Sequence, residues 1–152
     1  MAVISNSTQY TAQQSVARSG EPGDTRTFFF SGTTVNAAQG EINFITLPPG
    51  RIRVIPGLSS LIMANGAATA NVSVGHAAYK AANGVAVAAN AVLLQAARLV
   101  NAHIAATSNL VPVNAGVLFD SQDGIVIQGT VSTANTAANG AYEGTIVFAY
   151  LG

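Results

Sequence analysis

Short stretches of alternating apolar and polar residues recur along most of the chain, and turn residues separate them. Successive side chains of a strand point to opposite faces, so this period of two predicts half-buried β-strands. Glycine, proline and asparagine between the stretches supply the backbone conformations of turns. The stretches with strand character are residues 25–35, 41–47, 51–55, 58–63, 69–76, 124–133 and 142–151. The pattern predicts an all-β protein, a single β-sandwich of jelly-roll-like or Greek-key topology.

The stretch from Leu47 to Met63, LPPGRIRVIPGLSSLIM, has clear boundaries. Prolines and glycines on both sides confine a short strand in which arginines alternate with β-branched residues. The side chains of Arg51 and Arg53 therefore share one face, and the apolar residues between and after them share the other. The basic face has two interpretations, either a solvated strand face or a basic strip that docks onto an acidic partner surface.

Two segments near the C-terminus, residues 124–133 and 142–151, form the strongest strand pair in the sequence. The connection between them carries the turn signal Asn139-Gly140, so we expect the two strands to pair as a hairpin. Residues 109–119 contain two short apolar pieces broken by a proline and a glycine, which predicts an edge strand or a loop that touches the core.

The pattern changes after residue 84, where the chain becomes rich in alanine and poor in turn residues. Apolar side chains recur at helical spacing from Leu93 onwards. Asn90 is a suitable N-cap, so we expect a short helix from there to about Leu99. Two further strands are the alternative, because residues 85–87 alternate.

Residues 1–24 are polar, have no sustained period and end in GEPGD. We expect an extended N-terminal arm outside the core, followed by a β-sandwich domain of residues 25–152. A disordered terminus is the usual state of a chain end, whereas in an assembly protein such a segment orders along a neighbour. Val3, Ile4 and Tyr10 are the residues expected to anchor it there.

The low charge content points towards an assembly. Only 8% of the 152 residues are charged and 49% are hydrophobic, whereas about 25% are charged in ordinary soluble domains. Either uncharged polar residues solvate the surface, or other subunits cover much of it. The formal net charge of +0 gives no support for nucleic-acid binding. The chain has no cysteine and no apolar run long enough to span a bilayer. Its first residues lack a basic segment followed by an apolar one, so we expect no secretory signal.

No group of residues in the sequence has the spacing of an active site. His76 and His103 lack partners at metal-ligand spacing, and we expect both to be structural or solvent-facing. The carboxylates are scattered, and residues 120–124 have the chemistry of a turn, since a calcium site needs about six to eight oxygen ligands. There is neither a G-x-S-x-G elbow nor a Gly-rich phosphate loop. We therefore expect no enzyme activity, no cofactor and no metal.

Three segments that follow the polar arm, LPPGRIRVIPGLS, ANVSVGHAAYK and GTIVFAYLG, resemble the head decoration or cement proteins of tailed bacteriophages. The likeness lies in the general character of these segments and in their order along the chain, and it runs over most of residues 41–152. These proteins are commonly trimeric β-sandwiches without an active site. The resemblance implies a virion structural protein, made in the host bacterial cytoplasm, that binds the outside of the head and stabilises the shell across capsid subunit joints. It implies the major capsid protein and further copies of the chain, as a trimer, as partners, without nucleic acid or membrane.

The alternative is a receptor- or carbohydrate-binding module of a phage tail or head fibre. Such a module needs an exposed cluster of Tyr, Asn and Asp in loops, for example Tyr79 with Asn83, or residues 135–142. A hydrolase or isomerase on a cupin-type jelly roll is a third class, and it needs a histidine cluster that the sequence lacks.

Overall fold

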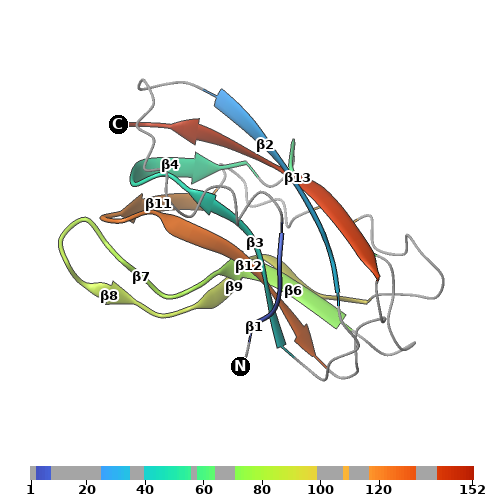
Figure 1. Ribbon diagram of the computed structural model, residues 1–152. Coiled ribbons are helices and arrows are strands. Elements are labelled where there is room, and N and C mark those ends of the chain that lie inside the picture. Colours follow the sequence, from blue (N-terminus) through green and yellow to red (C-terminus); the bar gives the residue numbers. More distant parts are fainter. Residues whose placement is uncertain are drawn as a thin grey trace.

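The computed structural model describes residues 3–7, 25–34, 40–55, 58–63, 71–98, 108–109, 117–132 and 140–152. Over these residues the backbone consists mainly of strands, which form two sheets packed face to face (Figure 1). The all-β sandwich predicted from the alternating pattern is confirmed. No helix within these ranges is long and apolar enough to cross a membrane.

Sheet A consists, in spatial order, of β1 (Val3–Asn6), β3 (Gly40–Leu47), β12 (Ile125–Ser132), β6 (Asn71–His76) and β9 (Asn90–Arg98). Sheet B consists of β10 (Ser108–Asn109), β5 (Ser60–Met63), β13 (Ala141–Tyr150), β4 (Gly50–Val54) and β11 (Val117–Ser121), with β2 (Thr25–Thr33) paired to β13. A small separate hairpin is formed by β7 (Tyr79–Lys80) and β8 (Ala86–Val87).

The strand order is that of a jelly roll. β4 and β5 pair with different parts of β13, and β11 and β10 pair in turn with β4 and β5. The couple β4 with β5 and the couple β11 with β10 each occupy the position of a single strand. The spatial order of sheet B is therefore β2, β13, β4 with β5, and β11 with β10. Sheet A reads β3, β12, β6 and β9, with β1 added beside β3. Strands that follow each other in the chain mostly lie in opposite sheets, which is the Greek-key connectivity of jelly rolls.

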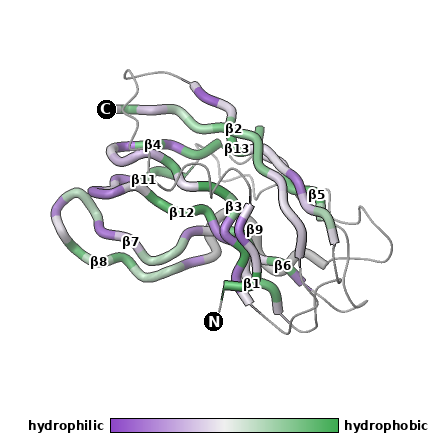
Figure 2. The backbone as a smooth tube through the Cα atoms, in the orientation of Figure 1, coloured by the Kyte–Doolittle hydropathy of each residue, from purple (hydrophilic) through white to green (hydrophobic). Residues whose placement is uncertain are grey.

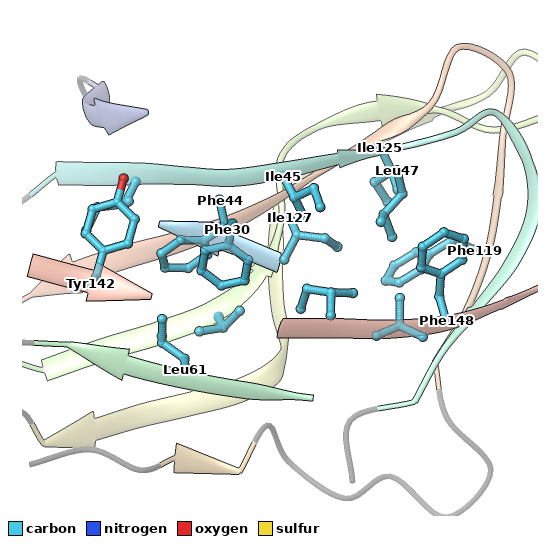
Figure 3. Close-up of a cluster of buried hydrophobic side chains, with 14 of the residues drawn as sticks. Phe30, Phe44, Ile45, Leu47, Leu61, Phe119, Ile125, Ile127, Tyr142 and Phe148 are labelled. Atoms are coloured by element: carbon cyan, nitrogen blue, oxygen red, sulfur yellow. The ribbon is translucent and has the colours of Figure 1, made fainter. Parts of the chain in front are cut away.

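Aromatic rings at the centre of the sandwich pack between the two sheets (Figure 3). The rings of Phe30 and Phe44 have centroids 4.9 Å apart, and Phe44 meets Tyr142 edge-on at 5.6 Å. Glycines make room for them: a Cβ on Gly129 would lie 2.8 Å from the ring of Phe44. A Cβ on Gly144 would lie 2.5 Å from the ring of Phe30. The inward faces therefore pack closely against each other, and partners can bind only on the outward faces and edges.

A β-bulge in β3 shifts its register with β12. Apolar side chains before and after the bulge point into the core. Ile45 lies opposite Ile127, but the next pair is Asn43 with Gln128, so β3 has one extra residue. The buried apolar residues of β3 are Ile42, Phe44, Ile45 and Leu47. The bulge also turns Asn43 outwards, where it faces other polar groups of sheet A.

The segment expected to form a helix is a strand instead. β9 pairs antiparallel with β6, with Asn90 opposite His76 and Arg98 opposite Asn71. Alanine favours a helix by only roughly a few tenths of a kcal/mol per residue over most other residues. The edge of β6 offers a row of backbone donors and acceptors that need partners, and pairing with β9 satisfies them. The predicted helix from Asn90 to about Leu99 is therefore wrong over residues 90–98.

The two strongest strands of the sequence do not form a hairpin. β12 lies between β3 and β6 in sheet A, whereas β13 lies between β2 and the β4–β5 couple in sheet B. Each is buried at the centre of its own sheet, where an apolar strand gains most from two neighbours. The prediction that residues 124–133 pair with residues 142–151 is wrong, because the connection crosses from one sheet to the other.

The N-terminal residues are also placed differently from the prediction. β1 pairs in parallel with β3, and Ile4 packs against the core. For residues 3–7 the expectation of an arm outside the core is therefore wrong. Polar side chains tie these residues to partners far along the chain, which a local pattern does not reveal. Residues 8–24, with Tyr10, lie outside the described part of the chain.

Candidate interaction surfaces

The outward side of sheet B, called the open face below, is formed by side chains that alternate with the core residues. Its members on the described strands include Phe29, Ser31, Arg51, Arg53, Ser60, Ile62, Leu118, Glu143 and Thr145. Phe29 is 69% exposed and Leu118 47% exposed. Val3, Leu58 and Val85 are also exposed, so these two residues make the open face a candidate surface and do not mark it by themselves.

A groove runs across the open face between β2 and β5. Its volume is about 490 Å³, and it is lined by Phe29, Phe30, Ser31, Ser60, Ile62, Glu143, Gly144 and Thr145. The hydroxyls of Ser60 and Thr145 share a hydrogen bond of 2.9 Å on its floor. The groove thus combines an exposed aromatic ring, one carboxylate and several hydroxyls. These groups suit a partner that presents both an apolar surface and hydroxyl or amide groups.

Arg51 and Arg53 lie where the alternating pattern placed them. Both are exposed on β4, and the residues between and after them are buried. Figure 2 shows hydrophilic and hydrophobic residues along β4. The register sets Asp120 of β11 opposite Arg51, and Leu118 opposite Arg53. A carboxylate beside one arginine offsets part of the positive potential there. Arginine is enriched in protein interfaces, and the exposed leucine beside it adds apolar surface. Docking by this pair stays a prediction.

The outward side of sheet A is organised by hydrogen bonds within the chain. Asn43 donates from Nδ2 to Oδ1 of Asn6 at 2.9 Å. Gln128 donates from Nε2 to Oδ1 of Asn43 at 2.9 Å and to the carboxylate of Glu41 at 3.2 Å. Asn43 and Gln128 are each only 7% exposed. These four residues, the amide ladder, satisfy one another's polar groups across three strands and leave few groups for a partner.

β1 is held in a slot on the edge of β3. The hydroxyl of Ser5 donates to the carbonyl of Thr33 at 2.7 Å and shares a hydrogen bond of 2.9 Å with the hydroxyl of Tyr142. The amide of Ser7 donates to the carbonyl of Asn43 at 2.9 Å, and its hydroxyl donates to the carbonyl of Phe44. Burial raises the pKa of Tyr142 above its ordinary value of 10.0, so the phenol stays protonated.

Two of the predicted anchors of the N-terminal segment have different surroundings. Val3 is 48% exposed at the edge of sheet A. Ile4 is partly buried and packs against the hydrophobic core. Anchoring on a neighbour stays a prediction for both residues, and Val3 is the one with an exposed side chain.

His76 is a core residue, as expected from the absence of metal spacing. Its ring meets Tyr79 and Phe119 edge-on at 5.2 and 5.4 Å, and its Nδ1 lies 2.9 Å from the carbonyl of Ala77. Tyr79 packs in this cluster and is half-buried, which makes it a poor sugar platform. Across the described ranges, no group of three or more His, Cys, Asp or Glu residues is arranged to hold a metal ion.

Neither Phe29 nor the amide ladder was predicted as a surface feature from the sequence. Phe29 had a recognisable signal, because three consecutive phenylalanines on a strand must place one ring on the face opposite the other two. The amide ladder had none, since its residues are distant in sequence and the bulge in β3 decides which way Asn43 points.

No protein-family model matches the chain, and no curated protein matches it either. A solved structure does. The fold is similar to that of a chain in the structure entitled "Cyanophage Pam1 capsid asymmetric unit", with a TM-score of 0.50 and 20% sequence identity. The match covers 91% of this chain and 95% of that chain. The two chains therefore share a fold over nearly their whole lengths.

Proposed function

We propose that the protein is a structural component of a phage virion, and specifically a decoration or cement protein bound to the outside of the head. The observation that carries the proposal is the shared fold over 91% of the chain with a component of a cyanophage capsid. The low charge content supports it, because a surface with 8% charged residues suits a chain whose faces are covered by other subunits.

The open face supplies the physical means for such a role. Specific interfaces bury on the order of 1,200–2,000 Å² and place apolar side chains and arginine near their centre. Phe29, Leu118 and the neighbouring Arg53 meet this description. In this proposal the open face contacts the major capsid protein, with Arg51 and Arg53 facing acidic groups of the shell.

The remaining partner in the proposal is a second and third copy of the chain. A closed trimer gives every copy the same contacts and multiplies a weak contact with the shell. Val3, and Tyr10 beyond the described residues, are proposed to contribute to contacts between subunits or with the shell. The protein works by binding alone in this proposal and has no enzyme activity, cofactor or metal.

Co-sedimentation tests the proposal. Shells assembled from the major capsid protein of the same genome are mixed with the purified chain and pelleted through a cushion. The expected result is saturable binding at a fixed ratio of copies, with a trimer in native mass measurements. A chain that stays in the supernatant at all concentrations would contradict the proposed role. Two controls accompany the measurement. Shells whose acidic surface residues are replaced by basic ones should bind the chain less, whereas a Lys80→Ser variant, changed outside the open face, should bind like the parent.

One observation favours the carbohydrate-binding alternative. The groove of the open face places the exposed ring of Phe29 near the carboxylate of Glu143, and a ring with a carboxylate can hold a sugar by stacking and by hydrogen bonds to adjacent hydroxyls. A glycan array separates the two functions. Binding that is lost in Phe29→Ala would support a receptor module, and an array without hits would leave the decoration role as the better account.

A further inference from the structure

The slot beside β3 has the features of a receptor for an extended peptide. Five polar groups that belong to the body of the domain face β1: the carbonyls of Thr33, Asn43 and Phe44, the amide side chain of Asn43 and the hydroxyl of Tyr142. All of them find partners in Ser5, Asn6 and Ser7. Thr33 is exposed, and the other groups are covered in part by β1 itself. An empty slot would leave the backbone edge of β3 and the core surface beneath Ile4 open to water, so a strand in the slot covers both.

The slot recognises side chains as well as backbone. Ser5, Asn6 and Ser7 each contribute a side-chain hydrogen bond to the body, and Ser7 is 0% exposed. A generic strand would use main-chain groups alone. The sequence Ser-Asn-Ser is thus part of the fit, and any copy of this chain carries it.

The chain between β1 and β2 is longer than a connection within one copy requires. Ser5 touches Thr33, the last residue of β2, and the chain must return to Thr25 at the start of that strand. A strand of nine residues is about 27 Å long from first to last residue. The 17 residues at positions 8–24 can extend over roughly 55–60 Å. The connection is therefore about twice as long as the strand it must pass, which leaves length for β1 to extend away from its own copy.

We infer that β1 is exchanged between copies: the N-terminal strand of one copy fills the slot beside β3 of a second copy. Exchange preserves every contact described above, since the donor and the slot are the same in each copy. In a closed ring each copy gives one strand and receives one, so no slot stays empty. The contact surface on the second copy is the edge of β3 with Thr33 and Tyr142. The inference does not depend on the proposed role in a virion.

A cysteine pair tests the exchange directly, because the chain has no cysteine of its own. Asn6 and Asn43 are register partners whose side chains meet at 2.9 Å, so Asn6→Cys with Asn43→Cys places two thiols within disulfide reach. The full-length double variant is refolded, oxidised and run without reductant. We expect covalent dimers and larger rings. A product that runs only as a monomer with an internal disulfide would overturn the inference.

Mixed single variants separate exchange from chance collisions. Asn6→Cys copies and Asn43→Cys copies are refolded together from urea, and the expected product is a covalent dimer of the two. Asn6→Cys with Ser31→Cys is the matched control, since Ser31 is exposed on the open face. Equal yields in both mixtures would overturn the inference.

A second pair covers the case in which the loss of the Asn6–Asn43 hydrogen bond prevents folding. Val3→Cys with Glu41→Cys uses register partners at the other end of β1, where Val3 is exposed. We expect the same covalent rings. If neither pair forms any disulfide in a folded protein, β1 does not occupy the slot, and the inference fails.

Discussion

The two outward faces of the sandwich satisfy their polar groups in different ways. On sheet A, Asn43 and Gln128 are almost fully buried and bond to each other, to Asn6 and to Glu41. On sheet B, Phe29 and Leu118 are open to water, and Leu118 lies opposite the exposed Arg53 of β4. The amide ladder on the first face is satisfied within the chain, and the second face has apolar and basic groups that a partner can use.

The comparison indicates that the amide ladder contributes to folding stability and that the open face contributes to binding. Removing a group from the amide ladder leaves others buried without partners, so such changes should act on folding. Removing a group from the open face exposes nothing new, so such changes should act on association. The four predictions below test this division, from the largest expected effect to the smallest.

The core beneath both faces should give the largest effect. Phe44 is fully buried and contacts the rings of Phe30 and Tyr142. Phe44→Ala should lower the free energy of unfolding by about 3–5 kcal/mol, because a large cavity remains between the sheets. Urea denaturation measures the change. A loss below about 1 kcal/mol would mean that the two sheets do not depend on this contact.

The amide ladder should come next. Asn43→Ala removes the acceptor of Gln128 and the donor to Asn6, and should cost about 1–3 kcal/mol of unfolding free energy. The matched change on the open face is Phe29→Ala, which should stay within about 0.5 kcal/mol. Urea denaturation of both variants measures the two losses of unfolding free energy. Equal costs for the two would remove the distinction between the faces.

Tyr142 gives a pH-dependent effect of intermediate size. Tyr142→Phe loses the hydrogen bond to Ser5 and should cost about 1 kcal/mol at neutral pH. The folded pKa of Tyr142 is raised above 10.0, so above that pH the unfolded chain loses this proton first. The stability of the parent should therefore fall as pH rises above about 10, and the variant should lack this contribution. Parallel declines of the two proteins in alkaline denaturation curves would contradict the assignment.

The arginines of the open face should have the smallest effect on folding. Arg51→Ser with Arg53→Ser should change unfolding free energy by less than about 1 kcal/mol, since both side chains are exposed. Binding to shells should weaken by up to about tenfold and depend less on salt, because screened charge pairs are lost. Sedimentation at two salt concentrations measures this. Unfolding of the isolated variant would mean instead that the pair supports the core.

The sequence predicts strands well where their own alternation decides the outcome. The segments around Ile52 and Ile127 are strands with the expected faces, because inward apolar and outward polar residues are local features. It fails where distant residues decide. Asn90 begins a strand because β6 needs a partner, and the N-terminal strand is placed by contacts with Thr33 and Tyr142. Among the surface residues, the alternation predicts the outward direction of Arg51 and Arg53. It does not predict the direction of Asn43 in the amide ladder, because the bulge in β3 decides it.

A reconstruction of the virion, compared with particles from which this gene is deleted, tests the proposed role most directly. The account predicts additional density on the outside of the head, at joints between capsid subunits, that fits the sandwich with its open face towards the shell. Particles of the deletion should lack this density and be less resistant to heat. Identical reconstructions with and without the gene would contradict the proposed role.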